Sequence, residues 1–114
     1  MQRDARARLY DAIRACQHII EFTGGKAVEE IADDVLLSSA VERQFEILGE
    51  SLNAFNRLQP TQGAQLEELS VAVAMRNLIA HQYFVVDTKT VVQTAHNDIP
   101  GLKVKLEAIL SDQD

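Results

Sequence analysis

The stretch VERQFEILGESLNAF, residues 41–55, decides the fold. Its apolar residues return every three or four positions, which is the spacing of one face of an α-helix. We expect this helix to begin near Asp34 or Ser39, because either residue can cap it, and to run to about Leu58. Pro60 closes it, since proline cannot continue a helix interior. The apolar face consists of Leu37, Val41, Phe45, Leu48, Leu52 and Phe55.

A polar row runs beside this apolar face. Its members are three and four residues apart, so they share one side of the helix. The row is either an exposed face with salt bridges or a surface that faces a polar site on a neighbouring helix or subunit. Gly49 lies between its members and lowers helix stability by about 1 kcal/mol relative to alanine, which indicates a close approach of another helix. The row consists of Arg43, Glu46, Glu50 and Asn53.

The remaining segments also have helical patterns. A chain of 114 residues with five Gly and two Pro has little material for the turns of an all-β fold. The segment 62–81 is so apolar that it is either central to a bundle or shared between the core and a dimer interface. Residues 26–33 form a connector or a single helical turn. We therefore predict one all-α domain, residues 1–114, folded as an up-and-down bundle of four to five helices. The further helices are expected over residues 4–22, 62–81, 88–97 and 98–110.

Composition excludes several classes of function. The net charge of −6 argues against general affinity for polyanions, so nucleic-acid binding would need a local basic or composite surface. The single cysteine, Cys16, excludes an intrachain disulfide and a cysteine-rich metal site, and it fits the core. The three histidines are scattered, so we expect no metal site and no cofactor. No apolar run approaches the roughly 20 residues that span a bilayer, and we expect a cytoplasmic protein without membrane association.

The segment MRNLIAHQY, residues 75–83, brings an arginine, an amide, a histidine and a tyrosine together. Around a helix, Asn77 and His81 lie about 40° apart, whereas Arg76 and His81 lie about 140° apart. One straight helix therefore does not point Arg76 and His81 at the same atom. A turn at the helix end would bring them together, and so would a second copy of the chain across a two-fold axis.

These residue types suit phosphodiester chemistry without a metal. Arginine binds phosphate oxygens in a bidentate way and stabilises charge that develops in a transition state. Histidine transfers protons near neutral pH, and an amide can orient either partner. A polar helix end, in which Arg76 and His81 cap backbone carbonyls, would explain the same residues. From the residues alone both interpretations stay open.

The pattern Arg76-Asn77-x-x-x-His81-x-Tyr83 resembles the R-x4-H-x-Y motif of HEPN-domain ribonucleases. It is most similar to the HepT-like toxins that are encoded beside a minimal nucleotidyltransferase antitoxin. The stretches FEILGESLN, YFVVD and NDIP, at residues 45–53, 83–87 and 97–100, resemble the same family. The resemblance implies a helical bundle that forms a two-fold homodimer, with both motifs in a composite cleft. Its expected lining includes Arg43, Glu46, Glu50 and Asn53.

The resemblance also implies a role for each motif residue. Arg76 would contact the scissile RNA phosphate, His81 would transfer the proton of the 2′-hydroxyl or of the leaving 5′-oxygen, and Asn77 would position one of them. The product would carry a 2′,3′-cyclic phosphate. Tyr83 would accept AMP from the antitoxin, which switches the toxin off. The alternative is a non-catalytic nucleotide-binding or regulatory subunit of a nucleotidyltransferase complex, and a third possibility is a plain structural dimer.

Overall fold

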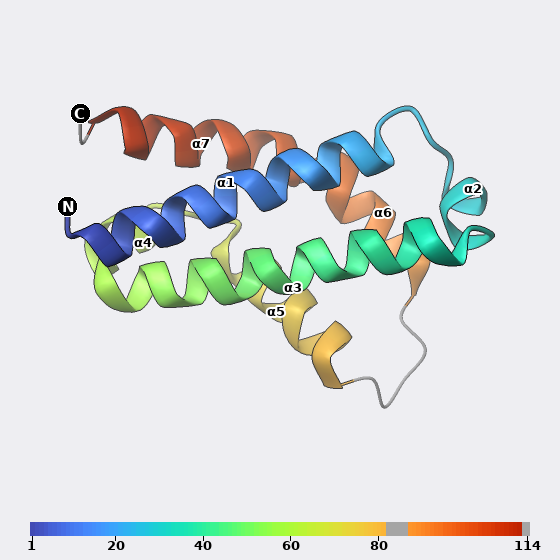
Figure 1. The fold of residues 1–114 in the computed structure, drawn as a ribbon, viewed down its shortest axis with the longest axis horizontal. Coiled ribbons are helices and arrows are strands. Elements are labelled where there is room, and N and C mark those ends of the chain that lie inside the picture. The colour runs from blue at the N-terminus through green and yellow to red at the C-terminus, as the bar shows by residue number, and fades with distance from the viewer. Residues whose placement is uncertain (82–86, 113–114) are drawn as a thin grey trace.

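The computed structural model describes residues 1–81 and 87–112, and the chain is all-α over these ranges. The described residues form seven helices (Figure 1). This exceeds the expected four to five because two short helices, α2 and α4, stand in the connections. The helices are α1 (Arg3–Thr23), α2 (Val28–Ala32), α3 (Val35–Leu58), α4 (Pro60–Gly63), α5 (Leu69–His81), α6 (Thr88–Asn97) and α7 (Ile99–Asp112).

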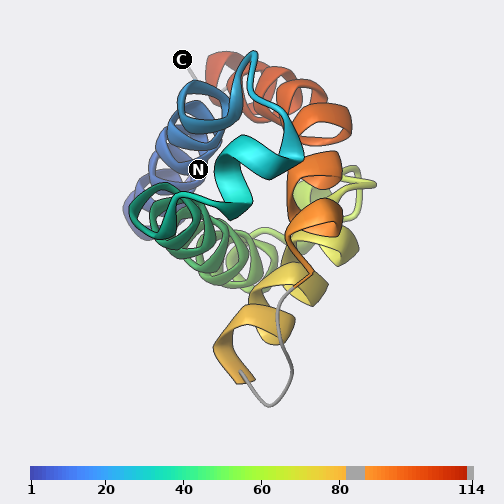
Figure 2. The same cartoon turned by 90° about the vertical axis from the view of Figure 1, so that its right-hand side faces the viewer.

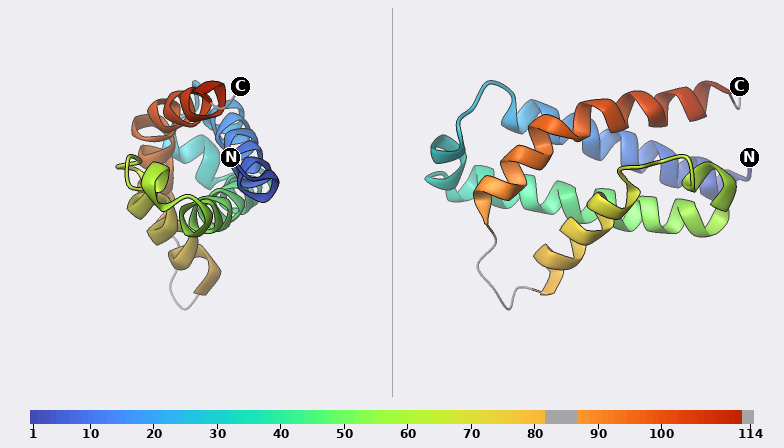
Figure 3. Two further views of the ribbon diagram at one scale, coloured as in Figure 1. Left: turned by 90° about the vertical axis from the view of Figure 1, so that its left-hand side faces the viewer. Right: turned by 180° about the vertical axis from the view of Figure 1, so that it is seen from behind.

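The long helices α1 and α3 are the frame on which the others pack. They run antiparallel along the long axis, and α7 lies along the other side of α1 (Figures 1 and 3). Helix α5 crosses α3 obliquely, and α6 joins α7 at a bend (Figure 2). The described helices include none that is long and apolar enough to cross a membrane.

Helix α3 has the ends and the face that its sequence predicts. Of the two candidate caps, Asp34 holds the N-terminus, since its carboxylate accepts a hydrogen bond of 3.0 Å from the backbone N–H of Leu37. The helix ends at Leu58, and Pro60 occupies the first turn of α4. Five of the six apolar-face residues are fully buried, and Leu37 is partly buried. The buried residues are Val41, Phe45, Leu48, Leu52 and Phe55.

The core continues into α1 through small and branched side chains. Cys16 is buried there, as expected, and burial raises the pKa of its thiol to about 12. Helix α1 ends before Gly24 and Gly25, and Gly25 has a φ of 70°, which glycine adopts without a steric cost. The same turn is fixed to α6, because a ring nitrogen of His96 lies 2.9 Å from the carbonyl oxygen of Thr23.

The third expected helix starts later in the chain than its sequence predicts. The spacing predicts a helix over residues 62–81, but α5 begins at Leu69, after the separate turn of α4. Gly63 packs so closely on α3 that a Cβ atom there would overlap the side chain of Asn56. Leu66 is buried from the following turn. Apolar spacing does not distinguish this turn from a helix, because both bury the same residue.

The turn before α5 is tied to α7 by an ion pair. The ammonium of Lys105 lies 2.8 Å from a carboxylate oxygen of Glu68. Burial acts to raise the pKa of Glu68, but the hydrogen bond and the charge of Lys105 outweigh it and leave that pKa lowered. The contact fixes the position from which α5 starts.

Helix α5 is apolar on more than one side, and only one side is buried. Ala72, Met75 and Ile79 face the core. Val71 and Leu78 are each 40% exposed. They are seven residues apart, so they lie on the same face of the helix. Of the two roles expected for this segment, a face shared with another surface fits better than a fully enclosed central helix.

Candidate active site

The site is built where α5 crosses α3 at Gly49. A Cβ atom at Gly49 would overlap the Cβ of Arg76 and would lie 2.9 Å from the carbonyl oxygen of Ala72. The absence of a side chain therefore lets the two helices approach at this point. The close approach expected from Gly49 is confirmed, and its consequence is that Arg76 stands directly against α3.

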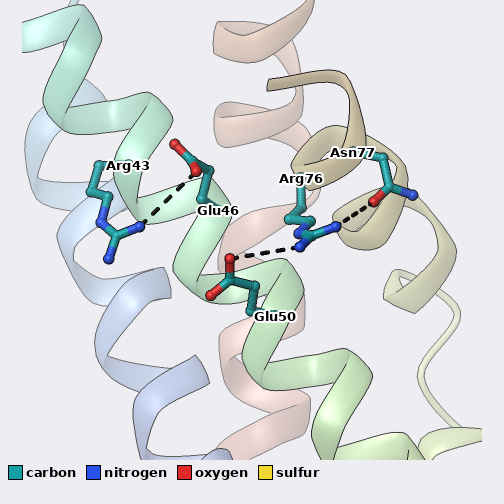
Figure 4. A network of polar contacts seen from close by, with 5 residues as sticks. All are labelled: Arg43, Glu46, Glu50, Arg76 and Asn77. Atoms are coloured by element: carbon teal, nitrogen blue, oxygen red, sulfur yellow. Dashed lines mark hydrogen bonds and ion pairs between the residues drawn. The ribbon is translucent and has the colours of Figure 1, made fainter. Parts of the chain in front are cut away.

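The guanidinium of Arg76 has a polar neighbour on each helix. Its Nη1 donates a hydrogen bond of 2.9 Å to Oδ1 of Asn77, and its Nη2 lies 3.8 Å from Oε1 of Glu50 (Figure 4). The Nε atom of Arg76 is buried and has no hydrogen-bond partner among the residues that the structure describes. The side chains of Arg76 and Glu50 are 36% and 51% exposed. Such an exposed, long ion pair contributes at most about 1 kcal/mol, so an anion can displace Glu50.

Arg76 lies at the edge of a shallow hollow of about 190 Å³ between α3 and α5. Two guanidinium groups and one carboxylate line the hollow, so its local charge is positive although the chain carries a net charge of −6. Two amide side chains add further hydrogen-bonding groups. The lining residues are Gly49, Glu50, Asn53, Arg57, Val73, Arg76 and Asn77.

The structure brings together only part of the expected site. Glu50 and Asn53 from α3 meet Arg76 and Asn77 from α5 in the hollow. His81 is the last residue of α5, but its side chain lies outside the part of the chain that the structure describes.

The other expected residues do not join this group within the described chain. Arg43 and Glu46 lie elsewhere along α3 and face each other at 4.0 Å, as Figure 4 shows. They do not line the hollow. Tyr83 lies outside the described residues. Over residues 1–81 and 87–112, no group of three or more His, Cys, Asp or Glu side chains is placed to hold a metal ion.

Arg57 lines the hollow but is not among the residues expected from the sequence. The sequence carries a signal for it, because Arg57 follows Asn53 by four positions. It therefore continues the spacing of the polar row that includes Glu46 and Glu50. The expected row stops at Asn53 and does not include Arg57.

Comparison with known proteins assigns the family. The model of the family described as "Ribonuclease HepT-like" matches residues 12–109. The chain belongs to the HepT-like ribonuclease family. The matched range includes every residue that lines the hollow. The resemblance seen in the sequence motif is thereby confirmed at the level of the family.

Relatives within the HepT-like family align with nearly the whole chain. The "Probable ribonuclease HepT" of Thermococcus cleftensis is 34% identical over 113 residues, which covers 96% of this chain and 98% of the relative. Two proteins of Methanocaldococcus jannaschii named "Putative RNase" are each 33% identical over 111 residues. These alignments cover 97% of this chain and 91% and 95% of the relatives. No solved structure matches the chain.

Proposed function

We propose that this HepT-like protein is a metal-independent endoribonuclease whose active site includes the hollow between α3 and α5. The observation that carries the proposal is the position of Arg76. Its guanidinium is held by Asn77 at 2.9 Å, its side chain is 36% exposed, and among the described residues its one carboxylate partner is Glu50, at the long distance of 3.8 Å. A phosphate that displaced Glu50 would receive a bidentate contact from a cation that is already oriented. Family membership supports RNA as the polyanion.

The reaction that these residues suit is an internal transfer of the phosphodiester. The 2′-oxygen of the RNA attacks the adjacent phosphorus, and the bond from phosphorus to the 5′-oxygen breaks. The 2′-hydroxyl loses its proton to a base, and the leaving 5′-oxygen takes up a proton. Arg76 stabilises the charge that grows on the phosphoryl oxygens, and His81 carries a proton in one of the two transfers. Asn77 fixes the orientation of Arg76.

The proposed active site is composite, with one motif from each of two chains. The angular separation of about 140° between Arg76 and His81 on a regular helix is the first support. The exposed Val71 and Leu78 on α5 are the second, since a second copy can cover them. A second copy on this face would place a second α5, and with it a second motif, beside the first. This arrangement lets the arginine of one chain act with the histidine of the other.

A chelator experiment tests the proposed chemistry. Purified protein should cleave RNA at the same rate with and without EDTA, because the nucleophile is the 2′-hydroxyl and Arg76 supplies the positive charge. The upstream product should end in a 2′,3′-cyclic phosphate, which mass spectrometry identifies. Cleavage that requires Mg²⁺ and leaves a free 3′-hydroxyl would contradict the mechanism.

RNA cleavage and thermal stability together distinguish the proposed ribonuclease from the alternative function. The pair between Glu50 and Arg76, together with the net charge of −6, is what a non-catalytic nucleotide-binding or regulatory subunit would also show. That function predicts no RNA cleavage even with excess protein. It also predicts a higher melting temperature when a nucleotide is added, because a ligand that binds only the folded state stabilises it.

The proposed control of this activity is the transfer of AMP to Tyr83 by a minimal nucleotidyltransferase that acts as an antitoxin. Bulky negative charge on the tyrosine of the motif would repel RNA by the same electrostatics that phosphorylation uses. With the transferase and ATP, the hydroxyl of Tyr83 should lose its proton and bond to the α-phosphorus as pyrophosphate leaves, so that the protein gains one adenylyl group (AMP less one water) and loses its RNA cleavage. Tyr83→Phe should abolish both changes. Tyr10→Phe is the matched control, since Tyr10 is 51% exposed on α1 and should leave both unchanged.

A further inference from the structure

Arg57 is the cation of the hollow that makes no ion pair among the described residues. Arg76 has Asn77 and Glu50 as neighbours. Arg57 is exposed, and over the described residues its guanidinium has neither a hydrogen bond nor an ion pair. An exposed arginine without a carboxylate partner can bind an anion without first breaking a contact. Of the two arginines that line the hollow, Arg57 is therefore the one that no carboxylate holds in an ion pair.

The position of Arg57 suits a phosphate other than the one at Arg76. It follows Glu50 by seven residues on α3, which corresponds to about 10 Å along the helix. Arg76 contacts Glu50, so Arg57 enters the hollow about two helical turns further along α3. A chain of RNA whose scissile phosphate lies at Arg76 and which follows α3 would present a neighbouring phosphate to Arg57.

A second hollow lies beyond Arg57 on the course that the RNA would follow along α3. Arg57 also lines a depression of about 450 Å³ between α1 and α3 that includes Arg8, Asp4 and Asp11. The two carboxylates there balance the two guanidinium groups, so the depression does not favour a polyanion. Arg57 lies at the border between the two hollows, and beyond it along α3 the acidic side chains offset the arginines.

We propose that Arg57 binds an RNA phosphate that flanks the scissile one, and so positions the substrate along α3. This rests on the proposed ribonuclease function and extends it to a residue outside the motif. Arginine suits the task because its planar guanidinium matches two phosphate oxygens at once. The competing explanation is structural, since Arg57 lies in the last turn of α3, where a cation stabilises the helix dipole.

The test compares Arg57→Ala, Arg57→Lys and the control Arg14→Ala. Arg14 is also exposed, but it lies on α1 in the groove between α1 and α7. Arg57→Ala should raise KM for RNA roughly tenfold and leave kcat unchanged at saturating RNA. Arg57→Lys should recover most of the affinity, because lysine keeps the charge. Arg14→Ala should behave as wild type.

Binding of an RNA with 2′-O-methyl groups gives a second measure that needs no cleavage. The logarithm of the binding constant should fall less steeply with the logarithm of salt concentration in Arg57→Ala. The slope should change by about 0.7 for each phosphate of a single-stranded RNA that the variant no longer neutralises. Melting temperatures of all variants show whether a change in affinity accompanies a change in fold.

Three results would overturn the role of Arg57. They are an unchanged KM and salt slope in Arg57→Ala, an equal loss of affinity in Arg14→Ala, and a loss that follows the melting temperature and is not recovered by lysine. Failure of the proposed function looks different. In that case the wild-type protein binds the methylated RNA without cleaving the unmodified one, and the salt slope still measures Arg57. Wild-type protein that neither binds nor cleaves would overturn both.

Discussion

Arg76→Ala should lower the rate of RNA cleavage by about 10²–10³-fold, which is the usual effect of removing one group that stabilises a transition-state charge. The physical reason is that Arg76 brings an oriented cation from α5 to the hollow, with Asn77 as its fixed neighbour. The effect should fall on kcat, because the charge it stabilises is largest in the transition state. Single-turnover cleavage with saturating protein measures it directly.

The fold should tolerate this change. Alanine keeps the Cβ atom that packs at Gly49, and the side chain that is removed is 36% exposed. The substitution also removes the Nε atom of Arg76, a buried donor without a partner among the described residues, so no hydrogen bond breaks at that atom. Circular dichroism and the melting temperature should therefore stay close to wild type.

Two further variants test the roles proposed for Asn77 and His81. Asn77→Ala should cause a smaller drop in cleavage, since it removes the group that orients Arg76 and leaves the charge in place. His81→Ala should cause a drop comparable with that of Arg76→Ala, because it removes the proposed proton carrier. If both Arg76→Ala and His81→Ala kept wild-type cleavage, the proposed active site would be wrong.

The sequence predicts α3 well because two independent local signals agree. The apolar spacing from Val41 to Phe55 defines the buried face, and Asp34 and Pro60 mark the ends. The sequence does not predict the start of α5 because the decisive contact joins two different helices. Gly63 packs on Asn56 in α3, and nothing in the spacing of apolar residues indicates that contact.

The candidate site also has a part that the sequence predicts and a part that only the tertiary structure shows. Glu50 and Asn53 follow from the spacing of the polar row, and Arg76 and Asn77 follow from the motif. The distance of 3.8 Å between Arg76 and Glu50 depends on where α5 crosses α3, which is a tertiary feature. Gly49 indicates that such a crossing exists, but a helix glycine does not identify the residue that approaches it. Only the tertiary structure identifies that residue.

Gly49→Ala should destabilise the fold and the site together. In an isolated helix this change stabilises by about 1 kcal/mol, because alanine is the better helix former. Here the new Cβ would overlap the Cβ of Arg76 and crowd the carbonyl oxygen of Ala72. Neither atom is the free end of a flexible chain, so α5 has to shift. Overpacking of this kind costs about 1–3 kcal/mol, and we expect a lower free energy of unfolding by denaturant.

Gly101→Ala is the matched control, since Gly101 is also helical but has nothing within 4 Å of an added Cβ over the described residues. There the helix propensity acts alone, and the free energy of unfolding should rise by up to about 1 kcal/mol. The two variants make the same chemical change and should therefore differ in sign. Equal stabilisation by both would show that α5 does not need the close approach at Gly49.

Gly49→Ala should lower RNA cleavage by more than the fraction of protein that it unfolds. Most of the protein stays folded after a decrease of about 1–3 kcal/mol from the usual total of about 5–15 kcal/mol. Cleavage should still fall by on the order of 10²-fold, because a shift of about 1 Å in a catalytic group has that effect. Cleavage measured well below the melting temperature separates the two causes. A fully folded Gly49→Ala protein with wild-type cleavage would mean that the position of Arg76 against α3 is not what the reaction requires.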